Sequence, residues 1–108
     1  MANLDPNKHP LITVKTRAEG DTPVVSLSGE LDLTNAERVQ SVIEDTLTGG
    51  TERLVIETSE LAFMDSSGLA LLASVARKVP EIELRDPSPN VRRLIELTGL
   101  ADILNVTP

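Results

Sequence analysis

Residues 63–69 carry the most informative chemistry of this chain, and they read Phe-Met-Asp-Ser-Ser-Gly-Leu. Asp65 places a carboxylate directly before the hydroxyl groups of Ser66 and Ser67. Apolar residues then recur at positions 69, 72, 73, 76 and 79, which is the spacing of one helix face. We therefore expect a helix to begin here, with a side-chain oxygen of Asp65 or Ser66 accepting a backbone N–H of its first turn.

A helix start of this kind tolerates negative charge, because its N–H groups point outward and the helix dipole is positive there. Ser66 could therefore carry a phosphate without disrupting the fold. An ordinary capped helix with no further role explains the same residues, and the local pattern leaves both interpretations open. Gly68 also has two interpretations: a side chain there would crowd a partner against the first helical turn, or the residue is a simple loop glycine.

Features of a catalytic site are scarce in the sequence. A serine nucleophile needs a base, and the only histidine, His9, lies in the N-terminal segment. The Gly-x-Ser-x-Gly, Walker and Gly-x-Gly-x-x-Gly motifs are absent, and the carboxylates match no calcium-binding loop. The chain has no cysteine, which excludes disulfides and thiolate chemistry. We expect a protein that is not an enzyme and uses no cofactor or metal, with Ser66 as a substrate rather than a catalyst.

The composition is that of an acidic, single-domain globular protein of 108 residues with a net charge of −7. Such a charge disfavours direct binding to nucleic acid or anionic membrane, and one Phe without Trp or Tyr offers no base-stacking platform. The expected partner is a basic or mixed protein surface. Residues 1–10 resemble neither a signal peptide nor a membrane span. We expect them to be a flexible tail before a cytoplasmic domain at residues 11–108.

Alternating and β-branched runs predict five strands, at residues 11–16, 23–28, 53–58, 81–85 and 103–106. Three helices are expected between them: one from a capping box at Thr34 to the glycines at 49–50, one over residues 66–79, and one from Ser88 to Gly99. Gly29 is expected to end the second strand, and residues 61–64 to lie in a loop.

The resulting order, β-β-α-β-α-β-α-β, predicts a single α/β domain with a mixed, mostly parallel sheet and an antiparallel first strand. Strand-to-helix junctions of parallel units emerge at one edge of the sheet, where open α/β folds place their sites. The junctions at residues 29–34, 61–68 and 85–89 should therefore converge. They would bring the two serines together with four carboxylates, those of Glu30, Asp32, Asp65 and Asp86.

Two pairs of residues near these junctions have competing interpretations. Phe63 and Met64 could form an exposed ridge that binds a partner, although we expect at least one of them to fill the core beneath the loop. Glu30 and Asp32 could contact a basic patch on a partner, or interact favourably with the dipole of the following helix.

Two motifs give the chain a family resemblance. Residues 27–32 read Leu-Ser-Gly-Glu-Leu-Asp at the end of the second predicted strand, and residues 63–69 follow at the expected separation. Residues 89–100 fit the third helix of the same family. Over roughly residues 11–106 the chain resembles the STAS domain of bacterial anti-sigma factor antagonists.

The resemblance implies a partner switch. In this family the unphosphorylated antagonist binds an anti-sigma factor, a GHKL-type serine kinase, and so frees a sigma factor. The kinase phosphorylates the serine after the aspartate, and a PP2C-type phosphatase reverses the modification. Carried onto this sequence, the acceptor is Ser66. The expected partner-binding residues are Glu30, Asp32, Asp65, Ser67, Gly68 and Leu69.

The chain departs from the family pattern in two places. The second helix runs into Pro80 and then directly into a strand, and the sequence stops at Pro108 where many relatives add a helix. Neither departure touches the acceptor loop. A STAS scaffold without phosphorylation, or an accessory subunit of a transporter or stress-signalling complex, is the alternative function.

Overall fold

The structure is a computed structural model that describes residues 11–108. The predicted tail at residues 1–10, with His9, lies outside the described residues. The elements are β1 (Ile12–Glu19), β2 (Thr22–Leu31), α1 (Ala36–Asp45), β3 (Arg53–Met64), α2 (Ser66–Ala76), β4 (Glu81–Arg85), α3 (Pro89–Thr98), the 3-10 turn η1 (Leu100–Asp102) and β5 (Asn105–Thr107).

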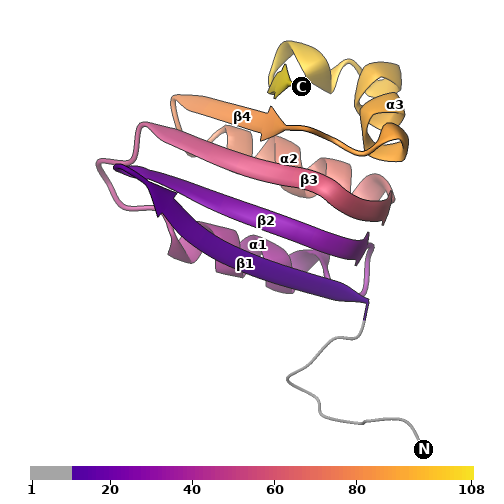
Figure 1. Cartoon of the computed structure of the whole chain (residues 1–108), viewed down its shortest axis with the longest axis horizontal. Helices are drawn as coiled ribbons and strands as arrows, with labels where there is room; N and C mark the ends of the chain where they lie inside the picture. The colour runs from indigo at the N-terminus through magenta and orange to yellow at the C-terminus, as the bar shows by residue number, and fades with distance from the viewer. Residues whose placement is uncertain (1–10) are drawn as a thin grey trace, which may run out of the picture.

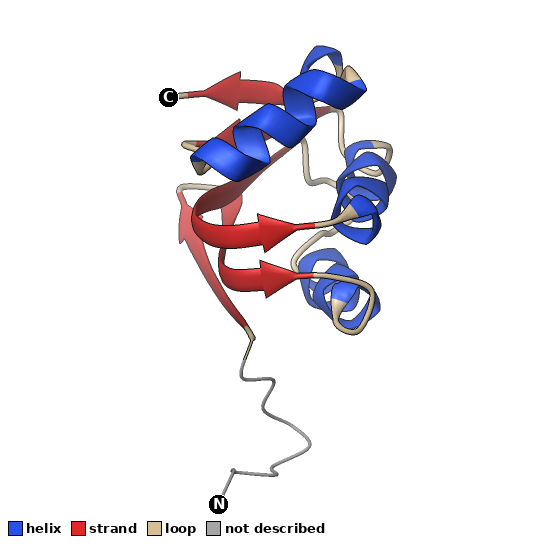
Figure 2. Cartoon of the chain, turned by 90° about the vertical axis from the view of Figure 1, so that its right-hand side faces the viewer, coloured by secondary structure: helices blue, strands red, loops and turns tan. Residues whose placement is uncertain are grey.

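The strands form one sheet in the order β1-β2-β3-β4-β5 (Figure 1). β1 pairs antiparallel with β2, and every other pairing is parallel. The predicted fold class, element order and antiparallel first strand are therefore confirmed. Figure 2 shows α1 and α2 side by side on one face of the sheet, with α3 beside its β4–β5 end. Within residues 11–108, no helix lies on the other face (Figure 1 and Figure 2).

The hydrophobic core lies between the sheet and the helices. Alternate residues of the central strands point into it, among them Val25, Leu27, Leu54 and Ile56, and all four are buried. They meet the apolar faces of the helices, contributed by Val39, Ile43, Leu72, Val75, Val91 and Ile95. Burial of each such side chain contributes about 1.5–3 kcal/mol relative to exposure, which fixes the helices over this face of the sheet.

Both central strands run further than their sequences indicate. β2 continues through Gly29 to Leu31, and β3 continues through residues 61–64, which were expected to form a loop. Leu31 pairs with Met64, so each strand extension is stabilised by the other. The register shifts at Gly29, where φ is +106°. The expectation that this glycine ends the strand was wrong, because it supports an irregularity within the ladder.

Helix α1 starts and ends differently from its sequence pattern. It begins at Ala36 rather than at a capping box on Thr34, and its N-cap residue, Asn35, makes no capping hydrogen bond. The helix stops at Asp45, before the two glycines, and the hydroxyl of Thr46 donates to the carbonyl of Ile43 there. By contrast, β4, the N-cap position of Ser88 and the left-handed C-cap at Gly99 (φ +77°) confirm the predictions, although the Ser88 side chain makes no capping hydrogen bond.

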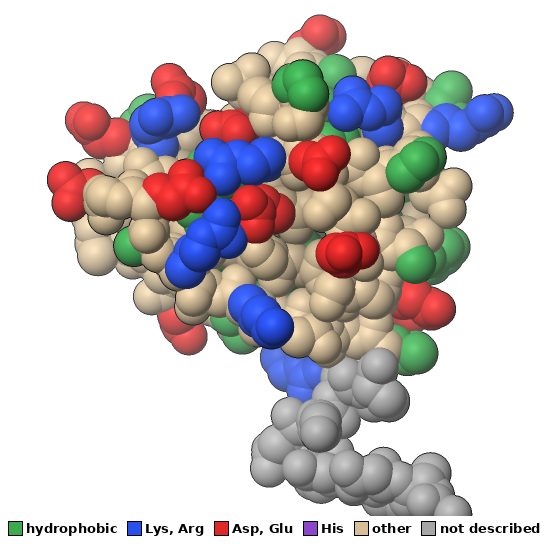
Figure 3. Space-filling model, in the orientation of Figure 1, with side chains coloured by type: hydrophobic (Ala, Val, Ile, Leu, Met, Phe, Trp, Pro, Cys, Tyr) green, Lys and Arg blue, Asp and Glu red, His purple; other side chains and the backbone are tan. Residues whose placement is uncertain are grey.

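Charged side chains cover the sheet face that carries no helix, and Figure 3 shows them gathered over the strands. Glu57 of β3 lies between Ser26 of β2 and Arg85 of β4 in the sheet register. Its carboxylate accepts two hydrogen bonds of 2.9 Å from the Arg17 guanidinium and one of 2.5 Å from the Ser26 hydroxyl. Arg85 also reaches Glu57, at 3.4 Å, and Glu19, at 3.0 Å. This network links four strands on their open face.

Replacing Glu57 with glutamine should make the free energy of unfolding less sensitive to pH in the acidic range. The hydrogen bonds from Arg17 and Ser26 lower the pKa of Glu57 from 4.5 to about 2. Because the folded-state pKa lies below the unfolded one, the stabilisation is full above pH 4.5 and is lost as the pH falls toward 2. After discounting for solvent screening, we expect Glu57→Gln to lower the free energy of unfolding by about 1–2 kcal/mol at pH 7. Urea denaturation at a series of pH values measures the difference.

The matched control is Glu60→Gln, on the same strand. Glu60 is exposed and forms no ion pair within residues 11–108. Its replacement should leave the unfolding free energy within about 0.5 kcal/mol of wild type. If Glu57→Gln lowered the free energy of unfolding relative to wild type by as much at low pH as at neutral pH, the assignment of the pKa shift to this network would be contradicted.

Candidate functional site

Two of the three predicted junctions meet where β2 and β3 end. Leu31 pairs with Met64, and the backbone N–H of Asp65 donates to the carbonyl of Leu31 at 3.2 Å. The loop between β2 and α1 therefore lies against the first residues of α2. This contact brings Glu30 and Asp32 to the same end of the sheet as the two serines.

The third junction contacts the second through Ser88 and Leu61, but it does not carry Asp86 to the ends of β2 and β3. β4 ends at Arg85, which is opposite Glu57, well before the end of β3. The start of α3 instead contacts the middle of this stretch of β3, with the Ser88 hydroxyl donating to the Leu61 carbonyl at 2.6 Å. The expectation that Asp86 joins the carboxylates around the serines was therefore wrong, because β4 is too short to carry Asp86 to that end.

The start of α2 is capped by Asp65. Its carboxylate accepts the N–H of Ser67 at 2.8 Å, and its carbonyl accepts the N–H groups of Gly68 at 3.0 Å and Leu69 at 3.3 Å. Of the two predicted capping residues, Asp65 rather than Ser66 has this role. The side chain of Ser66 is thereby left free. It is exposed, and its hydroxyl has no hydrogen-bond partner among the described residues.

The same cap changes the expected environment of a phosphate on Ser66. A helix start leaves four N–H groups without helical partners. At α2, the N–H groups of Asp65, Ser67 and Gly68 already bond to oxygens of the protein, so within residues 11–108 only that of Ser66 is left. The Asp65 carboxylate also occupies the position where the helix dipole favours an anion. A phosphate on Ser66 would therefore face a neighbouring negative charge with few free N–H groups to hold it.

Gly68 is needed for packing inside the protein. The residue is buried within α2, and a Cβ atom there would collide with Cγ and Sδ of Met64 and lie 3.0 Å from Cδ2 of Leu31. The interpretation as a simple loop glycine was wrong, since Gly68 lies within a helix and an added side chain would meet Met64. Its effect on a partner stays a prediction. Met64 fills the core as expected, whereas Phe63 remains 47% exposed.

The loop between β2 and α1 is held by a residue that the sequence pattern did not single out. Asn35 is 1% exposed, and its side chain accepts the N–H of Asp32 at 3.0 Å and donates to the carbonyl of Glu30 at 2.9 Å. Asp32 in turn accepts the N–H of Thr34 at 2.9 Å and its hydroxyl at 2.6 Å. These bonds fix the loop beside Ser66. The sequence signal that could have identified Asn35 is its side-chain amide shortly after two acidic residues, Glu30 and Asp32, at the end of a strand.

Replacing Asn35 with alanine should therefore destabilise the domain. The change leaves the N–H of Asp32 and the carbonyl of Glu30 without their partner in a largely buried position. We expect the free energy of unfolding to fall by about 2–3 kcal/mol. The control, Thr34→Ala, removes one bond from an exposed side chain and should cost less than about 1 kcal/mol. Equal losses in thermal or urea unfolding would show that Asn35 is not the anchor of this loop.

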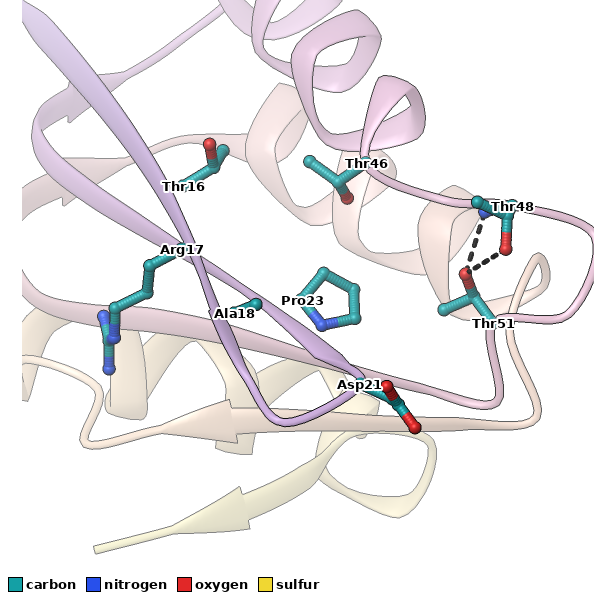
Figure 4. A pocket seen from close by; sticks show the side chains of 8 residues that line it. All are labelled: Thr16, Arg17, Ala18, Asp21, Pro23, Thr46, Thr48 and Thr51. Carbon is teal, nitrogen blue, oxygen red and sulfur yellow. Dashed lines mark hydrogen bonds between the residues drawn. The ribbon is translucent and has the colours of Figure 1, made fainter.

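Other surfaces of the described chain show fewer features of a functional site. An open pocket lies at the opposite end of the sheet, beside the β1–β2 turn (Figure 4). Its lining is mostly threonine and small residues, with Arg17 and Asp21 as the charged members, and Thr48 and Thr51 bond to each other there. Residues 11–108 hold no group of three His, Cys, Asp or Glu side chains placed to bind a metal ion. None of the described helices has the length and apolarity needed to cross a membrane.

Comparisons with known proteins agree with this geometry. The family model described as "Mlab, STAS domain" matches residues 14–106. Among curated proteins, the anti-sigma F factor antagonist of Lysinibacillus sphaericus is 34% identical over 85 residues, which cover 74% of this chain and 73% of that protein. The anti-sigma-B factor antagonist of Staphylococcus aureus is 25% identical over 99 residues, covering 88% and 92%.

Solved structures show the same similarity. An anti-sigma factor antagonist from Mycobacterium paratuberculosis superposes with a TM-score of 0.83 and 31% identity, covering 90% of this chain and 86% of that one. The antagonist SpoIIAA in its unphosphorylated form superposes with a TM-score of 0.75 and 26% identity, covering 89% of each chain. SpoIIAA of Bacillus has also been solved in the phosphorylated form, with a TM-score of 0.69 and 25% identity, covering 89% of this chain and 92% of that one.

Proposed function

Because the chain belongs to the STAS domain family, we propose that it is an anti-sigma factor antagonist that acts as a reversible partner switch. In its unphosphorylated form it binds an anti-sigma factor, a GHKL-type serine kinase, and so releases a sigma factor in the cytoplasm. Phosphorylation of Ser66 ends this binding, and a PP2C-type phosphatase restores it. The chain itself is a regulator and performs no catalysis. Relatives that are named anti-sigma factor antagonists support this role.

The observation that carries the proposal is the state of Ser66. Its side chain is exposed at the first position of α2, and its hydroxyl has no partner within the described chain. The adjacent Asp65 caps the helix, so modification of Ser66 breaks no bond on which the fold depends. A hydroxyl presented in this way suits a kinase substrate.

The switch works through charge and bulk. A phosphoserine carries about −1.5 to −2 charges at neutral pH. Three half-buried carboxylates, those of Glu30, Asp32 and Asp65, lie at the same end of the sheet and would repel it. Against an interface shaped for a bare serine, the phosphate adds like-charge repulsion and a desolvation cost. Binding is therefore lost without any need for the domain to refold.

The remaining predicted partner-binding residues divide into two groups. Glu30, Asp32, Asp65, Ser67 and Leu69 are all at least partly accessible, and they lie in or beside the two segments that the Asp65–Leu31 hydrogen bond joins, so we assign them to the docking surface. Gly68 contributes indirectly, because its lack of a side chain lets α2 pack close to Met64 and so sets the position of Ser66.

A competition assay tests the proposed function. The purified chain is added to a complex of a sigma factor with an anti-sigma factor kinase from the same genome, and free sigma factor is measured. We expect the unphosphorylated chain to displace the sigma factor, and chain pretreated with kinase and ATP to fail. Failure of the unphosphorylated chain with every GHKL-type kinase of that genome would contradict the proposal.

A further inference from the structure

Two exposed apolar side chains accompany Ser66 at this end of the molecule. Leu33 is 79% exposed in the loop after β2, and Phe63 is 47% exposed near the end of β3. The hydrogen bond from Asp65 to Leu31 joins the two segments, and Leu33, Phe63 and Ser66 each lie within two residues of it. In Figure 3 hydrophobic side chains gather along the margin where β2 and β3 end.

The loop that presents Leu33 is held by side-chain hydrogen bonds. The buried Asn35 side chain bonds to both Glu30 and Asp32, and Asp32 bonds to Thr34 on the other side of the leucine. Because Leu33 is 79% exposed, it buries little apolar surface within its own domain. A partner that buries it loses little conformational entropy in doing so, because the loop is already ordered.

Three acidic residues lie close to these apolar side chains in the described chain. Glu30 pairs with Phe63 across β2 and β3, and the carboxylates of Asp32 and Asp65 flank the strand ends. A second copy of this chain would place acidic groups against acidic groups, and the chain already carries a net charge of −7. The arrangement instead fits a protein with an apolar pocket bordered by Lys or Arg side chains.

We propose that Leu33 and Phe63 are the apolar anchors by which the chain docks into a basic-rimmed pocket of its anti-sigma factor. This inference rests on the proposed function and names the side chains that supply affinity at that interface. The acidic residues orient the partner, the two anchors hold it, and the phosphate on Ser66 prevents the approach.

Leu33→Ser tests this inference with a matched control. The control position is Leu97, which is 72% exposed in the last turn of α3, away from the strand ends. Binding to each GHKL-type kinase of the same genome, purified with ADP, is measured by surface plasmon resonance. We expect Leu33→Ser and Phe63→Ser each to raise the dissociation constant about 10- to 100-fold, mainly through faster dissociation. Leu97→Ser should change it less than about threefold.

The outcomes separate the inference from the proposed function. If wild-type chain binds a kinase and Ser66→Asp weakens that complex, but Leu33→Ser binds like wild type, the anchors are wrong and the switch stands. An equal loss in Leu97→Ser also overturns the inference, because exposed apolar area anywhere would then suffice. If wild-type chain forms no complex with any kinase, both proposals fall. Since Leu33 is almost fully exposed, its replacement leaves the core intact, and an unchanged melting temperature verifies this.

Discussion

Replacing Ser66 with aspartate should weaken the complex with the anti-sigma factor kinase about a hundredfold, which corresponds to about 3 kcal/mol of binding free energy. The new carboxylate would lie beside Asp65, which already occupies the anion position at the start of α2. Within an interface it would be desolvated against groups arranged for a neutral hydroxyl. Ser66→Ala removes only that hydroxyl and should keep the affinity close to wild type while abolishing phosphorylation.

The effect of the position of the charge can be separated from the effect of the chain's net charge by a control on α1. Ser41 is exposed on this helix, away from the strand ends, and Ser41→Asp adds the same charge to the same domain. Isothermal titration calorimetry with the kinase should show little change for this variant. If Ser41→Asp weakens binding as much as Ser66→Asp, the net charge of the chain rather than the Ser66 position controls the partner.

The largest loss of stability should come from Gly29→Ala. Gly29 has φ of +106°, a conformation that residues with a side chain rarely adopt, and an added Cβ would collide with the backbone carbonyl of Leu11. That carbonyl also accepts the N–H of Glu30, so the clash would push the start of β1 away from β2. We expect the free energy of unfolding to fall by more than about 3 kcal/mol.

Gly20→Ala is the matched control for this substitution. Gly20, in the β1–β2 turn, also has positive φ, at +63°, but apart from its own residue and its chain neighbours no atom of residues 11–108 lies within 4 Å of the position of its Cβ. It should lose only the conformational preference of glycine, about 1 kcal/mol. Guanidinium unfolding of both variants measures the difference. Equal losses would mean that the contact with Leu11 does not matter and that backbone conformation explains the whole effect.

Sequence patterns located the elements well wherever local signals were strong. The alternation in residues 81–85 predicted β4, and the Ser88-Pro89 pair predicted the start of α3. Asp65 followed by helical spacing predicted the start of α2. These signals depend on neighbouring residues only, so tertiary contacts were not needed to interpret them.

The errors occur where distant segments decide the local structure. Residues 61–64 lack a clear strand pattern, yet they are extended because β2 runs alongside them as far as Leu31. Gly29 resembles a strand end in sequence, whereas contact with the start of β1 determines its conformation. The sequence predicts a capping box at Thr34, whereas the neighbouring Asn35 bonds to backbone groups of the loop before it. Periodicity alone could not have revealed any of these contacts.

The candidate site shows the same division. The sequence placed Ser66, Asp65, Glu30 and Asp32 at one end of the sheet, because the topology of parallel strands requires it. It could not show that β4 stops too early to include Asp86, because strand length depends on pairing with β3 and β5. It also could not show that Gly68 faces Met64, since that contact depends on how α2 packs beneath the strand end.

Peptide-resolved mass spectrometry after incubation with ATP and the cognate anti-sigma factor kinase tests the central claim most directly. Wild-type chain should gain a single phosphate, on Ser66, and Ser66→Ala should gain none. Phosphorylation of Ser66→Ala to the wild-type level, or a wild-type chain modified only at another residue, would show that this hydroxyl is not the switch.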